Sequence, residues 1–109
     1  MFIIKDATRD TVIAQGALNG AVQIVEGQWY FRPEAVDMTN LTVTSRTYTC
    51  PYKGTCYWID LNAADGSVIR NIGWVYFDVK PGYEYLKDWI AFYARDTTGT
   101  RAIEGAATS

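Results

Sequence analysis

The feature that most constrains the fold is a succession of short extended runs with little chain between them. These runs are rich in β-branched and aromatic residues and are separated by turn signals such as Asn19-Gly20 and Asp65-Gly66. No segment between two runs is long enough for a helix that connects parallel strands. We therefore predict a mostly β fold: a compact antiparallel sandwich or partly open barrel with one or two short helical turns.

The pattern predicts individual elements along this chain. Strands are expected over residues 2–5, 11–14, 21–26, 29–31, 41–44, 56–61, 69–77, 89–93 and 100–103. Residues 72–77 are apolar on both faces, which is typical of a strand in the centre of a sheet. Pro33, followed by the acidic residue Glu34, predicts a short helix over residues 33–38. One helical turn is expected over residues 83–87.

Length and charge limit the domain count and the partners. A chain of 109 residues fits a single β domain with one hydrophobic core over residues 1–103, followed by a frayed tail over 104–109. The net charge is −2, from 10 basic and 12 acidic side chains that are scattered, so we expect neither nucleic acid nor a membrane as partner. A membrane-spanning run and the basic start of a signal peptide are both lacking, which predicts a cytoplasmic protein.

Histidine is absent, and this excludes several common chemistries. Ser-His-Asp and Cys-His catalysis both need it, as does His-ligated zinc. An enzyme of this composition would have to use lysine, tyrosine, cysteine or a carboxylate. Cys50 and Cys56 do not have the Cys-x-x-Cys spacing of redox and zinc motifs, so we expect no metal and no cofactor. In a cytosolic chain, both are expected to be thiols.

The segment Cys50-Pro51-Tyr52-Lys53-Gly54 is the most informative motif. Proline fixes φ and glycine permits positive φ, which together predict a tight turn with a bulge. Such a turn would hold Tyr52 or Lys53 outward on a rigid base and present one cation to an anionic ligand. The alternative is a plain hairpin turn with a solvated lysine. If Cys50 lies beside Lys53, its thiolate is favoured.

Further candidate residues lie outside this motif. Strand alternation turns Tyr30 away from its two aromatic neighbours and places Trp74 and Tyr76 on a common face. Arg32 offers a guanidinium fork that can bind an anion. Glu26 ends a strand, where it is either a partner for the turn lysine or a plain turn carboxylate.

With these residues in place, the chain resembles the bacterial "domain of unknown function 427" family of small β domains, sometimes labelled nucleotidyltransferase-like. The matching pieces are Val25-Glu26-Gly27, Trp29-Tyr30-Phe31-Arg32-Pro33-Glu34, the Cys50–Gly54 segment, Trp74-Val75-Tyr76 and Ile90-Ala91-Phe92-Tyr93. The resemblance implies a β fold and a site at the Cys50–Gly54 segment, but no particular reaction. The family usually has a small residue at the position of Cys56, which argues against a mechanism shared by both cysteines. No phosphate-binding loop or metal-binding acidic pair supports the transferase label.

Three hypotheses for function follow. The first is a domain that binds a small anionic or carbonyl-bearing ligand in an aromatic-lined pocket at this turn. The second is an enzyme whose base or nucleophile is the turn lysine, with a lowered pKa, or the neighbouring cysteine. The third is a structural or interaction subunit whose aromatic strands form a homodimer face. The candidate ligand-binding residues are Glu26, Tyr30, Arg32, Cys50, Tyr52, Lys53, Trp74 and Tyr76, and the candidate catalytic residues are Lys53 and Cys50.

Overall fold

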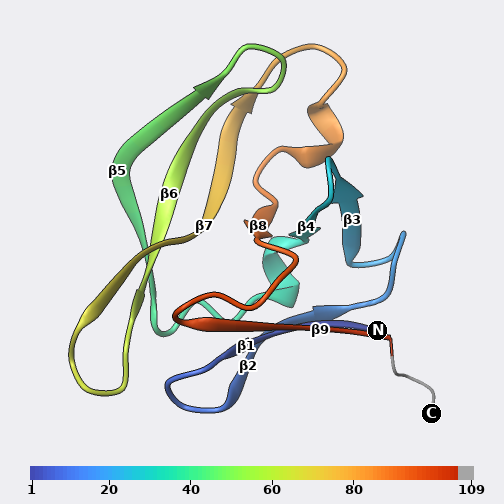
Figure 1. Cartoon of the computed structure of the whole chain (residues 1–109). Coiled ribbons are helices and arrows are strands. Elements are labelled where there is room, and N and C mark those ends of the chain that lie inside the picture. Colours follow the sequence, from blue (N-terminus) through green and yellow to red (C-terminus); the bar gives the residue numbers. More distant parts are fainter. Residues whose placement is uncertain (106–109) are drawn as a thin grey trace.

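The computed structural model describes residues 1–105 and consists of strands with two short 3-10 turns (Figure 1). The elements are β1 (Phe2–Asp6), β2 (Thr11–Gly16), β3 (Val22–Val25), β4 (Gln28–Phe31), η1 (Pro33–Ala35), β5 (Leu41–Cys50), β6 (Gly54–Asn62), β7 (Val68–Val79), η2 (Glu84–Leu86), β8 (Ile90–Phe92) and β9 (Thr100–Glu104). The predicted mostly β fold class is confirmed. No helix in residues 1–105 is long and apolar enough to cross a membrane.

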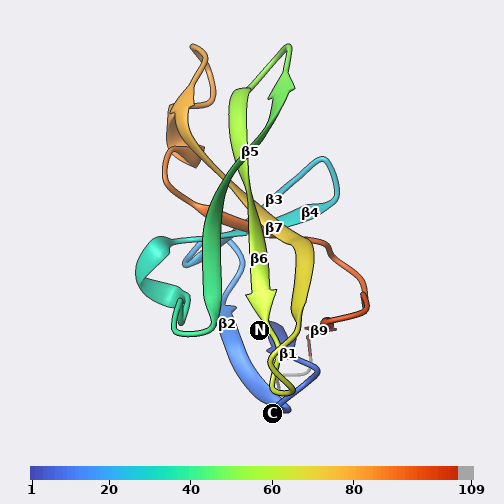
Figure 2. The same cartoon turned by 90° about the vertical axis from the view of Figure 1, so that its left-hand side faces the viewer.

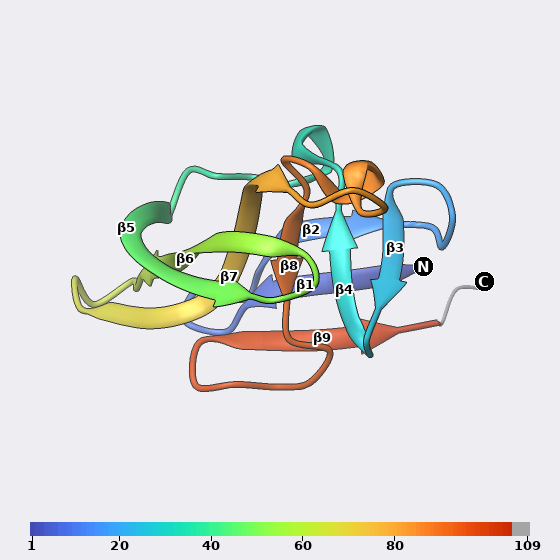
Figure 3. The same cartoon turned by 90° about the horizontal axis from the view of Figure 1, so that it is seen from above.

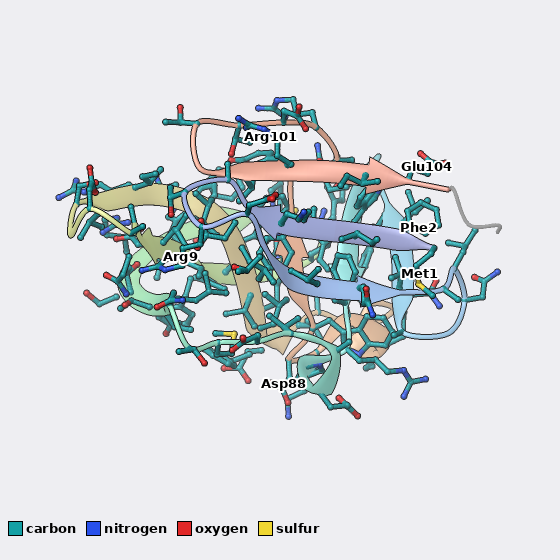
Figure 4. The ribbon with its side chains drawn as sticks, turned by 90° about the horizontal axis from the view of Figure 1, so that it is seen from below. Met1, Phe2, Arg9, Asp88, Arg101 and Glu104 are labelled. Carbon is teal, nitrogen blue, oxygen red and sulfur yellow. The ribbon has the colours of Figure 1, made fainter. Side chains whose placement is uncertain are left out.

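Two antiparallel sheets make up the architecture. The larger has six strands in the order β3-β4-β8-β7-β6-β5, and the smaller has three in the order β2-β1-β9. Strand β7 lies between β6 and β8, which confirms its predicted central place, and Figure 2 shows it beside the long β5–β6 hairpin. From above, β1 runs across β3, β4 and β8, and β9 runs alongside β1 (Figure 3). From below, the smaller sheet covers this side of the molecule, with the β1 residue Phe2 on its central strand (Figure 4).

The six-stranded sheet buries apolar side chains on both of its faces, so the expectation of one core is wrong. The first cluster joins the two sheets and includes Phe2, Ile4, Phe31, Ile59, Val75 and Phe92. The second draws only on the larger sheet and η2, and includes Tyr30, Cys50, Cys56, Trp74, Tyr76 and Leu86. Alternation along β7 explains the division, because successive side chains point to opposite faces. The second cluster is the one that bears the candidate site.

A polar cluster bends the long strands of the larger sheet. The Arg46 guanidinium of β5 contacts the buried Asp60 carboxylate of β6 and donates to Asn71 Oδ1 of β7 at 2.8 Å. Asn71 has a φ of 59° and its amide donates to Asp60 Oδ1 at 3.0 Å. The β5–β6 and β6–β7 registers both shift near these residues. Such irregularities increase strand twist and bend, so this edge of the sheet can curl.

Three element boundaries differ from the predictions. The helix expected over 33–38 is only the 3-10 turn η1, because Val36 is extended and bridges Ala14 of β2. The strand expected to end at residue 44 continues to Cys50, and the helical turn near residue 84 is confirmed as η2. Strand β9 includes Glu104, the first residue of the expected tail, and residues 106–109 of that tail lie outside the described part of the chain.

Candidate functional site

A cavity of about 300 Å³ opens on the face of the six-stranded sheet that points away from the smaller sheet. This volume lies at the lower end of the range of small-molecule sites. Strands β3 to β7, the turns that follow β3 and β5, and the residue after β8 all contribute to its wall. The lining residues are Val25, Glu26, Gln28, Tyr30, Tyr48, Cys50, Lys53, Cys56, Trp58, Trp74, Tyr76 and Tyr93.

The turn between β5 and β6 directs Lys53 into this cavity. Gly54 has a φ of +126°, and a Cβ there would lie 2.7 Å from the Asp78 carbonyl oxygen of β7. The Lys53 carbonyl accepts the Lys80 amide at 2.8 Å, and Lys80 Nζ donates to the Pro51 carbonyl at 3.0 Å. The predicted tight turn is confirmed. The alternative of a solvated lysine is wrong, because Lys53 is only 4% exposed.

Glu26 pairs with Lys53 from the opposite edge of the sheet. Glu26 and Gly27 form the β3–β4 turn with φ values of 54° and 80°, the positive values that two-residue hairpins require. The Glu26 carboxylate accepts a hydrogen bond from Lys53 Nζ. The two side chains differ greatly in exposure, 61% for Glu26 and 5% for Lys53. The ion pair therefore links the two outer hairpins across the mouth of the cavity.

The surroundings keep the Lys53 side chain charged. Burial alone would lower its pKa, but the hydrogen bond to Glu26 and the neighbouring Tyr30 and Cys50 raise the pKa above its ordinary value. Nζ also lies 5.8 Å from the centre of the Tyr83 ring, a cation–π arrangement. The lowered lysine pKa that the enzyme hypothesis required is thus wrong for Lys53. It is a fixed ammonium, suited to binding an anion rather than to accepting a proton.

Aromatic rings form the walls in interlocking edge-to-face contacts. Trp74 stands at their centre, with ring centroids 6.1 Å from Tyr30, 6.0 Å from Trp58 and 5.0 Å from Tyr93. Its indole Nε1 donates to the Tyr30 hydroxyl at 3.2 Å. Burial raises the pKa of Tyr30, so the hydroxyl keeps its proton. Each edge-to-face pair of this kind adds stabilisation beyond the burial of its rings, which favours this arrangement of the wall.

The two cysteines are free and buried, and they differ in character. Cys50 Sγ accepts the Lys53 amide at 3.4 Å. Burial opposes ionisation of Cys50, but hydrogen bonds from the Lys53 and Tyr52 amides and the Lys53 charge outweigh it and lower the pKa. Burial raises the pKa of Cys56. Only Cys50 therefore has the environment of a reactive thiolate.

The structure brings together six of the eight predicted site residues: Glu26, Tyr30, Cys50, Lys53, Trp74 and Tyr76. Arg32 does not line the cavity. Its Nε donates to the Gly20 carbonyl at 3.2 Å, and its guanidinium lies over the Trp89 ring. Tyr52 is in the turn, is 68% exposed and does not line the cavity. The structure therefore does not bring these two residues together with the other six.

Sequence reasoning missed several lining residues, some of which strand alternation indicates. Trp58 lies two residues after Cys56 on the same face of β6, and Tyr48 lies two residues before Cys50 on β5. Gln28 lies two residues before Tyr30 on β4 and carries the same signal. Its Oε1 accepts the Ala94 amide at 2.9 Å and so holds the chain beside Tyr93. In residues 1–105, no three Cys, Asp or Glu side chains gather into a group that could hold a metal ion.

Comparison with known proteins bears on the family alone. A comparison with curated protein sequences found no match. The family model described as "Domain of unknown function (DUF427)" matches residues 8–102, which include every residue of the cavity wall. Because this match covers most of the chain, the protein belongs to the DUF427 family.

Proposed function

We propose that this domain binds a small anionic or carbonyl-bearing molecule in the cavity beside Lys53. The observation that carries the proposal is a charged lysine, 4% exposed, at the wall of a cavity otherwise formed mainly by aromatic rings. An ammonium group has three donors, of which Glu26 accepts one. Few polar groups in a mostly apolar cavity are the usual arrangement of a small-molecule site.

A metabolite screen by thermal shift tests this proposal. Compounds that raise the melting temperature of the native protein should lose most of that effect in Lys53→Met, because the cation that fixes their acceptor group is gone. Lys87→Met is the matched control, since Lys87 is exposed and does not line the cavity. A screen in which no anionic or carbonyl compound stabilises the native protein, or in which Lys53→Met responds like the control, would count against the proposal.

The environment of Cys50 favours a second candidate, an enzyme in which Cys50 is the nucleophile. Its sulfur lines the cavity next to the Lys53 ammonium. In such a reaction, sulfur would form a bond to a carbonyl carbon, and the carbonyl electron pair would move to oxygen, where Lys53 stabilises the charge. This candidate retains the alternative of the enzyme hypothesis in which the cysteine, rather than the lysine, is the nucleophile.

Alkylation with iodoacetamide tests the second candidate. A lowered pKa means that the thiolate persists to lower pH, so the rate at Cys50 should reach its half-maximum below the pH of an ordinary cysteine. Lys53→Met should move that midpoint upward, because a stabilising positive charge is removed. Cys56→Ser should leave the Cys50 profile in place. A Cys50 midpoint at or above the pH of an ordinary cysteine would rule out Cys50 as an activated nucleophile.

A further inference from the structure

We infer that the ligand of this site is a small aryl carboxylate, which displaces Glu26 and takes its place on Lys53. The inference rests on the proposed binding function and narrows it to one chemical class. It follows from the unequal exposure of the two partners in the ion pair and from the nature of the cavity wall.

The exposure of the two ionic partners decides which of them can leave. Glu26 is at the tip of a hairpin turn with its side chain 61% exposed, so its carboxylate can withdraw into water at small cost. Lys53 is fixed by a turn bonded to Lys80, the residue after β7, and is 5% exposed at its side chain. A buried ammonium without a partner is strongly unfavourable. A ligand that displaces Glu26 must therefore bring its own negative charge.

The charge of the site distinguishes three classes of ligand: carboxylates, neutral carbonyl compounds and cations. A carboxylate preserves the neutral pair by exchange with Glu26. A neutral carbonyl compound must bind with Glu26 still in place, because it cannot neutralise Lys53. A cationic ligand would add a second positive charge beside Lys53, which costs free energy in a site of low dielectric constant. The carboxylate is the one class of the three that gains from the departure of Glu26.

The walls specify the rest of the ligand. The lining includes four aromatic rings, in which Trp74 makes edge-to-face contacts with Tyr30, Trp58 and Tyr93. Flat rings pack against such walls with offset or edge-to-face geometry, and these contacts add to the gain from burial. The cavity is about 300 Å³, which suits one or two fused rings better than an extended chain.

Three probes with a common ring system test the inference: naphthoate, naphthamide and naphthylmethylamine. Each is titrated into nitrogen-15-labelled protein, and the indole N–H signals of Trp58 and Trp74 report binding at the cavity. The variants are Glu26→Gln and Lys53→Met, with Glu34→Gln as the control because Glu34 is exposed on η1.

We expect naphthoate to bind the native protein at least about tenfold more tightly than either other probe, as for a charge-assisted contact. Glu26→Gln should tighten naphthoate binding about three- to fivefold, because the competing carboxylate is gone while the amide cannot compete as an anion. Glu34→Gln should change nothing, and Lys53→Met should cost at least about tenfold.

Two results would overturn the inference. The first is either equal binding of naphthamide and naphthoate or weaker naphthoate binding in Glu26→Gln. Either outcome would mean that the ligand binds without displacing Glu26, and the proposed binding function would stand. The other is silence of the indole signals with all three probes. That result removes the aryl carboxylate class, and the metabolite screen with Lys53→Met then decides separately whether the cavity binds anything.

Discussion

At the scale of single residues, the Tyr30 hydroxyl connects the cavity wall to its charged end. It accepts the Trp74 indole N–H at 3.2 Å, and its position near Lys53 contributes to the raised pKa of that lysine. Tyr30 is 2% exposed and Trp74 is 8% exposed, so neither group can exchange this partner for bulk water. One hydrogen bond therefore orients the central ring of the wall and places a hydroxyl beside the ammonium.

Replacing Tyr30 by phenylalanine should destabilise the protein by about 1–3 kcal/mol, because the buried indole N–H of Trp74 is left without an acceptor. The free energy of unfolding from urea titration measures this. Tyr85→Phe, at a residue 51% exposed, should stay within about 0.5 kcal/mol of the native protein. Equal effects of the two substitutions would show that the Tyr30–Trp74 hydrogen bond contributes nothing.

Strand alternation predicted part of this site and could not predict the rest. It correctly turned Tyr30 away from Trp29 and Phe31, and it placed Trp74 and Tyr76 on one face. It said nothing of the direction of the turn, where Lys53 is buried and Tyr52 is exposed because the turn is bonded to Lys80, the residue after β7. Strand alternation also could not place Arg32, because β4 ends at Phe31 and Arg32 lies outside the strand.

At the scale of elements, two hairpin turns with positive-φ glycines form opposite sides of the cavity mouth, and they differ in what surrounds the glycine. A Cβ on Gly54 would lie 2.7 Å from the Asp78 carbonyl oxygen. Gly27 has a φ of +80° and no atom within 4 Å of such a Cβ. The β5–β6 turn is therefore held against β7, whereas the β3–β4 turn stands free.

Gly54→Ala should be more destabilising than Gly27→Ala. Gly27→Ala costs only the strain of an alanine at positive φ, about 1–2 kcal/mol. Gly54→Ala adds a steric conflict with backbone, so we expect a loss above about 3 kcal/mol and displacement of Lys53. Urea unfolding measures both losses, and the alkylation rate of Cys50 reports the position of the turn. Equal losses at the two glycines would contradict the close approach to β7.

Element boundaries were predictable only where local pattern decides them. The alternation of β6 and the apolar run of β7 gave both strands in nearly their observed extent. Strand β5 continues past residue 44 because its pairing with β6 resumes beyond the irregular register between Val43 and Thr47. The helix expected after Pro33 ends early because Val36 pairs with β2. Both outcomes depend on tertiary contacts that the sequence does not display.

At the scale of the whole molecule, the two faces of the larger sheet have different surroundings. Its inner face packs against the smaller sheet, and its outer face carries the cavity. The Glu26–Lys53 pair joins hairpins at opposite edges of that sheet, 27 residues apart in sequence. The sequence offered this contact only as one of two alternatives for Glu26, because the pairing depends on the curl of the sheet as well as on both turns.

Neighbouring residues on β6 offer a test of this separation. Ile59 is fully buried between the sheets, so Ile59→Val should lower the free energy of unfolding by about 0.5–1.5 kcal/mol and leave naphthoate binding unchanged. Trp58 lines the cavity and is only partly buried, so Trp58→Phe should weaken naphthoate about three- to tenfold with a smaller loss of stability. Urea unfolding and the Trp74 indole titration measure the two effects independently. If both substitutions changed binding and stability in the same proportion, the two faces of the sheet would act as one unit, and Trp58 would be a packing residue rather than part of a separate site.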